Sequence, residues 1–461
     1  MVDRVKLAVI GGGGFRVPLL VKALAGSPFE VHLYDDDPAR LGVIRNVIAG
    51  MGLPLPAFHG MDDACAGADP GLDHALTSAL SGADFVFTAI RVGGPEGRAL
   101  DERIAQRHGF LGQETVGLGG MAYALRTIPA ARRIAAAIAT HAPTAWTINF
   151  TNPAGIVTQA MQETLGNRAI GICDTPISLV HRVAGDAPLD SIDYAGLNHL
   201  GWLRSVTSHG RDLVRELLAD DAALAGLEEA QVFGPDVLRS IGALPNEYLF
   251  YYWFTREAIE RIGQRDGRGA YLAAQQGAFY AAAAAAPERA YALWSQALAD
   301  REETYGAEAR EDAASRRTEE EIAGGGYQEV ALTLMTALAG GTPSLTISNV
   351  RNDLGGTRAI AQLPGSAVVE IPCLVDGNGI RPLPIAPVST EMAGLMVQVK
   401  ASDELLLAAT SQRDAELAVR ALAAHPLIDS LTAARAALAE YCAEVPGIAT
   451  AIGWTPDPHV W

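Results

Sequence analysis

Short, largely apolar runs of strand length alternate with helical patterns through the first part of the chain. They occur at residues 5–10, 30–34, 83–90, 144–150 and 168–172. Each run leads into glycine or polar residues before the next helical segment. Strands that are apolar on both faces and separated by helices are typical of an open sheet covered on both sides. The pattern therefore predicts an α/β fold of the Rossmann type for this part.

The pattern changes from about residue 210, where the sequence becomes helical and rich in alanine. Runs at residues 345–350 and 367–371 predict further strands, and the charged stretch 302–321 predicts a solvated helix. A chain of 461 residues is too long for one small core, so we expect two closely packed domains. We place a Rossmann-type, NAD-binding domain at residues 1–194 and a larger, mainly helical α+β domain at residues 195–461.

A glycine turn follows the first predicted strand. The run at residues 5–10 ends in Gly11, Gly12, Gly13 and Gly14, after which a helical pattern resumes. Such a turn lets a pyrophosphate approach bare backbone N–H groups at the start of a helix. The position of the usual third glycine holds Arg16, so the fingerprint is imperfect and an ordinary strand–helix turn is the alternative.

Asp35 strengthens the case for a dinucleotide. It closes the second predicted strand a little over twenty residues after Gly11, where a carboxylate would bind the ribose hydroxyls of NAD and repel the extra phosphate of NADP. Alternatively, the run 35–38 caps the next helix, and both interpretations can hold. Phe15, Arg40 and Asn149 complete the predicted cofactor-binding set.

Cationic and polar residues follow the third and fourth predicted strands. Arg91 and Arg98 are candidates for an anionic substrate group, although Arg98 could instead pair with Asp101 or Glu102. The glycine-rich stretch 109–120 suits a loop that folds over a ligand. Asn152, held by the proline after it, could face cofactor and substrate or cap the following helix.

Composition narrows the class of partner. The net charge of −18 argues against a nucleic-acid surface or an anionic membrane, and 49% hydrophobic with 19% charged residues describes a globular protein. The four scattered cysteines show no CxxC spacing, which fits a reducing compartment. We find no secretory leader and no membrane-spanning run, and we expect a cytoplasmic protein.

Taken in order, the motifs resemble those of the family 4 glycoside hydrolases, the NAD- and divalent-metal-dependent group. The resemblance runs almost end to end, and among branches the chain is most similar to the 6-phospho-β-glucosidases. The matching segments are residues 11–13, 91–102, 112–120, 149–153, 171–176, 196–200, 248–252, 325–327, 349–352 and 370–372. The resemblance implies an NAD-binding domain like that of lactate and malate dehydrogenases, followed by a domain for substrate, metal and oligomerisation.

The resemblance also implies hydrolysis of 6-phospho-β-glucosides by an unusual route. In this family NAD⁺ oxidises the C3 hydroxyl, a tyrosine removes the C2 proton, and the aglycone is eliminated; water then adds and NADH returns the hydride. A divalent ion, usually Mn²⁺, stabilises the enediolate. The substrate would be a phosphorylated disaccharide or glucoside, and the family habit is a homodimer or homotetramer.

Residue by residue, the resemblance assigns roles to matching positions. Cys173 and His199 match the metal ligands. Their spacing alone does not establish a metal site, because a cysteine is often simply buried and a lone histidine is more often a core or surface residue. Tyr248 matches the base, and Asp174 matches the acid of the phospho-α-glucosidase branch, where many β-enzymes carry asparagine. The arginines that qualify for the 6-phosphate are Arg91, Arg98 and Arg351, and Asn149 and Asn152 match cofactor- and substrate-contacting positions.

Four alternatives remain open on sequence. Asp174 favours a 6-phospho-α-glucosidase, and an unphosphorylated glycosidase of the same family is a second possibility. The glycine turn and the strand-end asparagine also occur in NAD-dependent dehydrogenases of the lactate/malate type, which lack the cysteine–histidine pair. A non-catalytic NAD-binding regulator is the fourth, although Cys173, His199 and Tyr248 argue against it.

Overall fold

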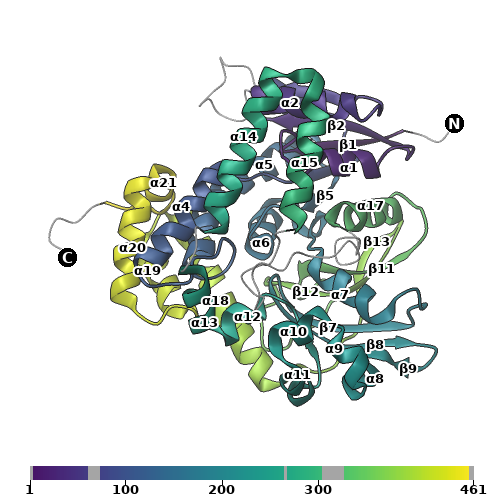
Figure 1. Cartoon of the computed structure of the whole chain (residues 1–461), viewed down its shortest axis with the longest axis vertical. Coiled ribbons are helices and arrows are strands. Elements are labelled where there is room, and N and C mark those ends of the chain that lie inside the picture. Colours follow the sequence, from purple (N-terminus) through teal and green to yellow (C-terminus); the bar gives the residue numbers. More distant parts are fainter. Residues whose placement is uncertain (1–3, 61–72, 264–266, 304–325, 456–461) are drawn as a thin grey trace.

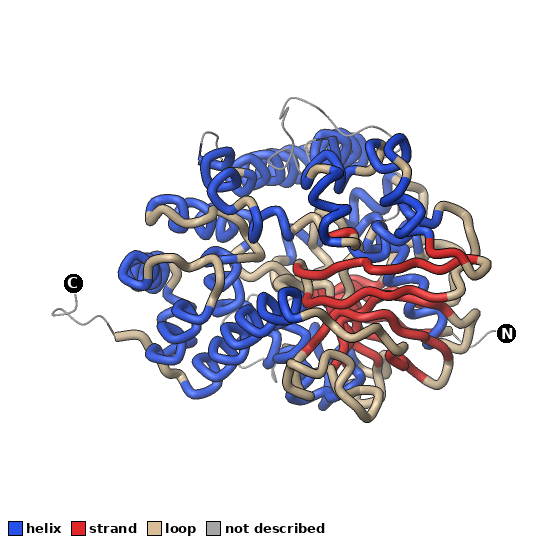
Figure 2. The backbone as a smooth tube through the Cα atoms, turned by 90° about the horizontal axis from the view of Figure 1, so that it is seen from below, coloured by secondary structure: helices blue, strands red, loops and turns tan. Residues whose placement is uncertain are grey.

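The computed structural model describes residues 4–60, 73–263, 267–303 and 326–455. Most of the charged stretch 302–321 lies outside these residues. The described strands form one 13-stranded sheet, in the order β10-β8-β7-β12-β11-β6-β5-β4-β1-β2-β3, with β13 paired to β12 and β9 to β8. Helices surround this sheet (Figures 1 and 2).

Six strands of the first part pair in parallel, as in a Rossmann fold. They are β1 (Val5–Ile10), β2 (Phe29–Asp35), β3 (Ala57–Gly60), β4 (Phe85–Thr88), β5 (Trp146–Asn149) and β6 (Ala169–Gly171). The predicted fold class is confirmed. The five predicted strands of this part are present, β1 with its predicted ends and the other four with slightly different ones. The pattern missed β3, whose Ala-Phe-His-Gly sequence is neither apolar nor alternating.

Antiparallel strands extend the same sheet beyond β6. They are β7 (Ser191–Leu197), β8 (Leu200–Ser208), β9 (Arg211–Asp212), β10 (Leu244–Pro245), β11 (Ser344–Arg351), β12 (Val368–Asp376) and β13 (Gly379–Pro382). The junction is the antiparallel pair of β11 and β6, with Asn349 opposite Gly171. The proposed boundary at residue 194 lies inside β7, so the sheet continues across it.

Helices cover both faces of the sheet. Those of the first part are α1 (Val17–Ala23), α2 (Pro38–Gly50), α3 (His74–Leu80), α4 (Gly94–Arg107), α5 (Gly117–His141), α6 (Ala154–Leu165) and α7 (Thr175–Ala184). Those that follow are α8 (Leu213–Ala219), α9 (Asp221–Ala225), α10 (Glu228–Phe233), α11 (Pro235–Ile241), α12 (Leu249–Trp253), α13 (Thr255–Gly263), α14 (Arg268–Ala285), α15 (Ala290–Glu303), α17 (Tyr327–Leu338), α18 (Thr390–Gln412), α19 (Ala415–Ala424), α20 (Leu431–Glu444) and α21 (Pro446–Ile452). Among the described helices, none combines the length and the apolar character that crossing a bilayer requires.

Helix α5 differs from the prediction at two places. It begins at Gly117, inside the stretch predicted to be a loop, and it continues past Pro129, where a kink or break was expected. Its first turn packs against the preceding loop so closely that a Cβ on Gly119 would lie 2.4 Å from the carbonyl oxygen of Gln113. The glycines of this stretch therefore serve close packing of loop on helix.

Three clusters of buried apolar side chains hold the layers together. The largest spans both parts of the sheet, and the second lies between the first part and α18–α21. The third is small and joins the turn after β1 to α2, α14 and α15, with Phe15, Val47, Phe279 and Trp294 among its members. In Figure 1, α14 and α15 lie beside α2, although they follow it by more than 200 positions in the chain.

Candidate active site

A cavity of about 970 Å³ lies at the carboxyl ends of β1, β4, β5 and β6. Ligands bind at this edge of open α/β sheets. Segments of the second half close the opposite wall, among them parts of α14 and α15. The sequence-predicted residues that line the cavity are Gly11, Gly13, Gly14, Phe15, Asp35, Arg40, Arg91, Arg98, Asn152, Cys173, Asp174, His199 and Tyr248.

The glycine turn forms one end of this cavity. The N–H groups of Gly11 and Gly12 donate to the carbonyl oxygen of Tyr34 at 2.9 and 2.7 Å, which folds the turn against β2. Gly11 has a φ of 96°, and a Cβ on it would lie 2.6 Å from the carbonyl oxygen of Ala89. A side chain is therefore excluded there, and bare backbone faces the cavity, as a pyrophosphate site requires.

Asp35 lies directly beside the turn. Its carboxylate accepts the N–H of Gly13 at 2.7 Å and the N–H of Asp37 at 2.9 Å. Burial raises the pKa of this carboxyl group to about 6. Asp37 caps α2 by accepting the N–H of Arg40 at 2.9 Å, which confirms the capping interpretation for the run 35–38. The two functions are divided between neighbouring residues: Asp37 caps, and Asp35 faces the cavity.

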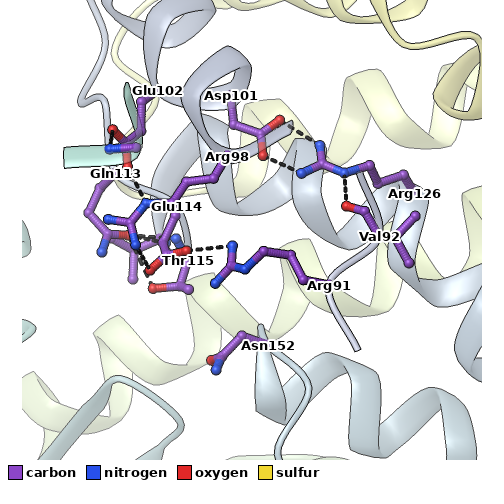
Figure 3. Close-up of polar contacts among 12 residues, drawn as sticks. Arg91, Val92, Arg98, Asp101, Glu102, Gln113, Glu114, Thr115, Arg126 and Asn152 are labelled. Carbon is purple, nitrogen blue, oxygen red and sulfur yellow. Dashed lines mark hydrogen bonds and ion pairs between the residues drawn. The ribbon is translucent and has the colours of Figure 1, made fainter. Parts of the chain in front are cut away.

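Glu114 joins the two predicted anion-binding arginines (Figure 3). Its two oxygens lie 2.7 Å from Nη1 of Arg91 and 2.6 Å from Nη1 of Arg98. Although burial opposes ionisation, the two guanidinium groups lower the pKa of Glu114 to about 2. Arg98 also donates from Nε to Glu102 at 2.7 Å, so one of the pairings considered from sequence is confirmed.

Asp101, the other partner considered for Arg98, binds elsewhere. Its carboxylate accepts both terminal nitrogens of Arg126, at 2.6 and 2.5 Å, and Nε of Arg126 donates to the carbonyl oxygen of Val92 at 2.8 Å. The pair is almost fully buried. It fixes the segment that carries Arg91 at the end of β4 (Figure 3).

Cys173 and His199 bring a thiol and an imidazole to the same cavity. Burial, together with the charges of Glu370 and Asp174, raises the pKa of the Cys173 thiol. Burial lowers the pKa of His199 to about 3, which keeps the imidazole neutral and its lone pair available. Within the described residues, buried Nδ1 of His199 and Oδ1 of Asn152 have no hydrogen-bond partner.

This donor set fits a divalent cation whose coordination is completed by other ligands. A thiolate and a neutral imidazole suit a transition-metal ion. The described part of the chain contains no group of three or more His, Cys, Asp or Glu side chains that could hold a metal. Catalytic metal sites keep a coordination position open for substrate or water, whereas structural sites are closed.

His199 owes its position to a tight hairpin. Asn198 and His199 form the two-residue turn between β7 and β8, and His199 has a left-handed φ of 63°. The ring of Tyr248 stacks on that of His199, with centroids 3.7 Å apart and planes 1° from parallel. Strand β10 pairs with β8 and thereby brings Tyr248 to this place. The hairpin thus unites the predicted metal ligand with the predicted base.

A buried carboxyl group, that of Glu370, lies close to this region. Glu370 on β12 accepts Nδ2 of Asn349 at 2.8 Å and the hydroxyl of Tyr194 at 3.1 Å. Burial raises the pKa of Glu370 to about 7. The resemblance had included residues 370–372 without assigning them a function; the structure places Glu370 in the network beneath Cys173 and the β7–β8 hairpin.

The two strand-end asparagines have different environments. Asn152 lines the cavity at a cis peptide bond to Pro153, and the proposal that it caps α6 is wrong, because Asn198 accepts the N–H of Ala154 at 3.0 Å instead. Asn149 is fully buried. Its side chain accepts the hydroxyl of Thr88 at 2.8 Å and does not reach the cavity wall.

Two further candidates also lie away from the cavity. Gly12 packs against Leu33, where a Cβ would lie 2.8 Å from the leucine Cβ. Arg351 is not among the lining residues and pairs with Asp353 at 2.9 Å. The structure therefore leaves Arg91 and Arg98, of the three arginines considered for a phosphate, at the cavity.

Sequence comparison assigns the chain to a family. The model of the family 4 glycosyl hydrolases matches residues 6–188, and the model of the family's C-terminal domain matches residues 194–428. The chain belongs to glycosyl hydrolase family 4. The predicted enzyme class is thereby confirmed, and the dehydrogenase alternative drawn from the glycine turn is removed.

Relatives of this family 4 hydrolase carry names for both anomeric types. One, named a probable 6-phospho-beta-glucosidase of Bacillus subtilis, is 28% identical over 95% of this chain and 96% of that protein. The 6-phospho-alpha-glucosidase 1 of Lacticaseibacillus paracasei is 30% identical over 73% of this chain and 74% of its own. A 6-phospho-alpha-glucosidase from gut microorganisms, solved with NAD and Mn²⁺, is 25% identical with a TM-score of 0.74, covering 96% and 99% of the two chains.

The sequence reasoning missed several residues that shape the family 4 site. Glu114 had been noted only as a polar group near a loop, and its double ion pair could not be read from one segment. Tyr280 and Trp294, which donate hydrogen bonds to the carbonyl oxygens of Gly13 and Phe15, belong to no recognisable motif. The one signal was that they are large aromatic residues in otherwise alanine-rich helices, which requires a partner for them.

Proposed function

We propose that this family 4 hydrolase cleaves 6-phosphoglucosides, with NAD⁺ as a resident cofactor and a divalent cation such as Mn²⁺. The main observation behind this proposal is that a single cavity brings these groups together. It is lined by the glycine turn, by Arg91 and Arg98, and by Cys173 with His199 and Tyr248. The names of the relatives, which are 6-phospho-β- and 6-phospho-α-glucosidases, support the phosphorylated substrate.

The chain's own residues would share the work as follows. Gly11 and its neighbours leave room for the pyrophosphate, and Asp35 accepts hydrogen bonds from the ribose hydroxyls. Arg91 and Arg98 hold the substrate phosphate against the competing carboxylate of Glu114. Cys173 and His199 hold the cation. When bound, the cofactor and the cation supply reversible hydride acceptance and polarisation of the sugar oxygens.

Tyr248 has the position of a general base. Ionised to the phenolate, its oxygen would take the proton from C2 of the sugar, and the stacked ring of His199 fixes the orientation of the phenol ring. With C3 in the ketone form, loss of the C2 proton would expel the aglycone from C1. Water would then add across the C1–C2 double bond, and return of the hydride to C3 would complete a net hydrolysis in which no NADH accumulates.

The anomer is the open point within this proposal. We favour 6-phospho-β-glucosides, as the resemblance indicates. Asp174, which lines the cavity at the start of α7, favours the α-anomer because it matches the position that serves as acid in the phospho-α-glucosidase branch, where many β-enzymes carry asparagine. We further propose a cytoplasmic enzyme that assembles as a homodimer or homotetramer.

One assay decides among these possibilities. Chromogenic 6-phospho-β-glucoside, its α-anomer and the unphosphorylated β-glucoside are each supplied with NAD⁺, Mn²⁺ and a thiol reductant. We expect release of the chromogen from the phosphorylated β-anomer with a constant NADH absorbance. Preference for the α-anomer would reassign the specificity, and turnover of the unphosphorylated sugar would reassign the arginines. No turnover of any glycoside, or steady NADH accumulation, would contradict the hydrolase proposal.

A further inference from the structure

Three aromatic side chains from the second half of the chain donate hydrogen bonds to the glycine turn and its helix start. The hydroxyl of Tyr280 donates to the carbonyl oxygen of Gly13 at 2.6 Å. Nε1 of Trp294 donates to that of Phe15 at 2.8 Å. The hydroxyl of Tyr327 donates to the carbonyl oxygen of Arg16 at 2.7 Å. The donors come from three different helices, α14, α15 and α17.

Phe15 fastens the same turn by apolar contacts. Its side chain is only 4% exposed. It meets Phe279 edge-to-face with ring centroids 5.3 Å apart, and Trp294 at 6.4 Å. Phe15 lines the cavity while its ring belongs to the third apolar cluster, which points toward α14 and α15. The turn is therefore bound to the second half by its one large side chain as well as by its carbonyls.

Helix α14, which carries Tyr280, is held by hydrogen bonds near both of its ends. At its start, the N–H of Gly269 donates to Glu102 at 2.6 Å, and Glu102 in turn accepts Arg98. Toward its end, Tyr280 reaches the glycine turn. Between these points Gln276 lines the cavity. The helix thus spans the cavity from the arginine cluster to the predicted cofactor site.

One of these hydrogen bonds sets a group that a pyrophosphate would meet. The other two fix peptides whose N–H groups, those of Gly14 and Val17, donate to carbonyl oxygens of the turn itself. A peptide unit is planar, so a donor that fixes a carbonyl also fixes the direction of the next residue's N–H. Trp294 on the carbonyl of Phe15 therefore sets the N–H of Arg16, the residue before α1. Ordering these peptides before binding removes an entropic cost from association.

We propose that Tyr280, Trp294 and Tyr327 are positioning residues for the cofactor: through them the second half of the chain holds the glycine turn in its binding form and slows release of NAD⁺. This inference rests on the proposed NAD⁺ site. It gives the C-terminal helices a function beyond substrate binding. A cofactor that must accept and return a hydride within one turnover gains from slow release.

Tyr327→Phe and Tyr280→Phe test the inference because each removes a donor and keeps its ring. Tyr327→Phe is the cleaner of the two, since the hydroxyl of Tyr280 also bonds the guanidinium of Arg40. The ring of Tyr327 continues to stack on Phe150, 4.3 Å away, and that of Tyr280 to lie under Arg40. We expect each variant to raise the Kd for NAD⁺ about 3- to 10-fold, the loss of one hydrogen bond. In stopped-flow displacement the rise should fall on the dissociation rate, while the KM for the glucoside stays unchanged.

The matched control is Tyr271→Phe. Tyr271 lies on the same helix, and its hydroxyl bonds Asp300 of α15 instead of the turn. Its NAD⁺ affinity should equal that of the unmodified protein, measured by titration calorimetry alongside the thermal midpoint without cofactor. Equal weakening by Tyr271→Phe would mean general loosening of α14 and α15 and would overturn the inference. Unaltered affinity in both test variants would also overturn it and leave the proposed function intact, whereas no NAD⁺ binding by the unmodified protein would overturn both.

Discussion

Cys173 and His199 differ in what they need before they can bind a cation. Burial raises the pKa of the thiol, so the sulfur remains protonated until a cation displaces the proton, whereas the imidazole is already neutral. We predict that Cys173→Ser raises the Mn²⁺ concentration for half-maximal activity at least about tenfold, because a hydroxyl is a poorer ligand than a thiolate. The measurement is a Mn²⁺ titration of glucoside turnover after chelation.

Cys373→Ser provides the control for this substitution. Cys373 is fully buried on β12, and its sulfur donates to the carbonyl oxygen of Ile371 at 3.5 Å, away from the cavity. Its Mn²⁺ dependence should match that of the unmodified protein. An unchanged Mn²⁺ titration in Cys173→Ser would remove Cys173 from the metal site.

A substitution at Tyr248 can distinguish proton abstraction from cofactor binding. We predict that Tyr248→Phe retains NAD⁺ binding, since the ring still stacks on His199, and loses about 10²- to 10⁴-fold in turnover, the usual contribution of a general base. Exchange of the C2 proton with deuterated solvent, followed by NMR, should be lost with it. Tyr251→Phe, a buried neighbour on α12, should exchange normally. Retained exchange in Tyr248→Phe would assign the base to another group.

Among the elements, α5 shows that a glycine-rich stretch can be the tightly packed start of a helix and not a loop. We predict that Gly119→Ala lowers the free energy of unfolding by about 2 kcal/mol or more, because the added methyl group would overlap the backbone of Gln113. Gly277→Ala is the control: it lies in the interior of α14 with open space around it, and should stabilise the protein by roughly 0.5–1 kcal/mol. Denaturant unfolding measures both. Similar values for the two variants would show that the close contact does not decide the cost.

The strands were predictable because buried parallel strands carry continuous apolar runs, and β1 matched its predicted ends. The short strand β3 was not predictable, because it is held by its pairing with β2 and has no apolar run of its own. Helix α5 passes through Pro129 where local propensity predicts a break, because tertiary packing on both sides outweighs the lost hydrogen bond.

The sequence predicted which strand ends form the site, but it did not predict most of the contacts between side chains there. Asn149 and Asn152 carry the same local signal, yet Asn149 turns into the core and Asn152 faces the cavity. Glu114 and the aromatic donors meet their partners only after folding. Tyr280 and Gly13, for example, are separated by 267 positions. No pattern within one segment encodes such a contact.

At the scale of the molecule, the two halves of the chain are joined by the single sheet and by the hydrogen bonds to the glycine turn. The stability of each half should therefore depend on the other. Strand β11 pairs with both β6 and β12, and Tyr327 binds the carbonyl of Arg16 across the halves. We predict one unfolding transition on heating, with far-ultraviolet dichroism and tryptophan fluorescence coinciding. NAD⁺ at 100 times its Kd adds about 2.7 kcal/mol, which should move the whole transition up by roughly 3 °C at this chain length.

This expectation differs from that for two domains joined only by a linker, where ligand would stabilise the domain that binds it and leave the other in place. Fluorescence resolves the cases because Trp146 lies on β5 and Trp202 on β8, in opposite parts of the sheet. The chain has six tryptophans, so the signal of each of these two is obtained as the difference between the unmodified protein and Trp146→Phe or Trp202→Phe. If only the Trp146 signal shifts with NAD⁺, the halves unfold independently and the shared sheet does not couple them. An equal shift of both signals means that the cofactor stabilises the substrate-binding strands as strongly as the turn that holds it.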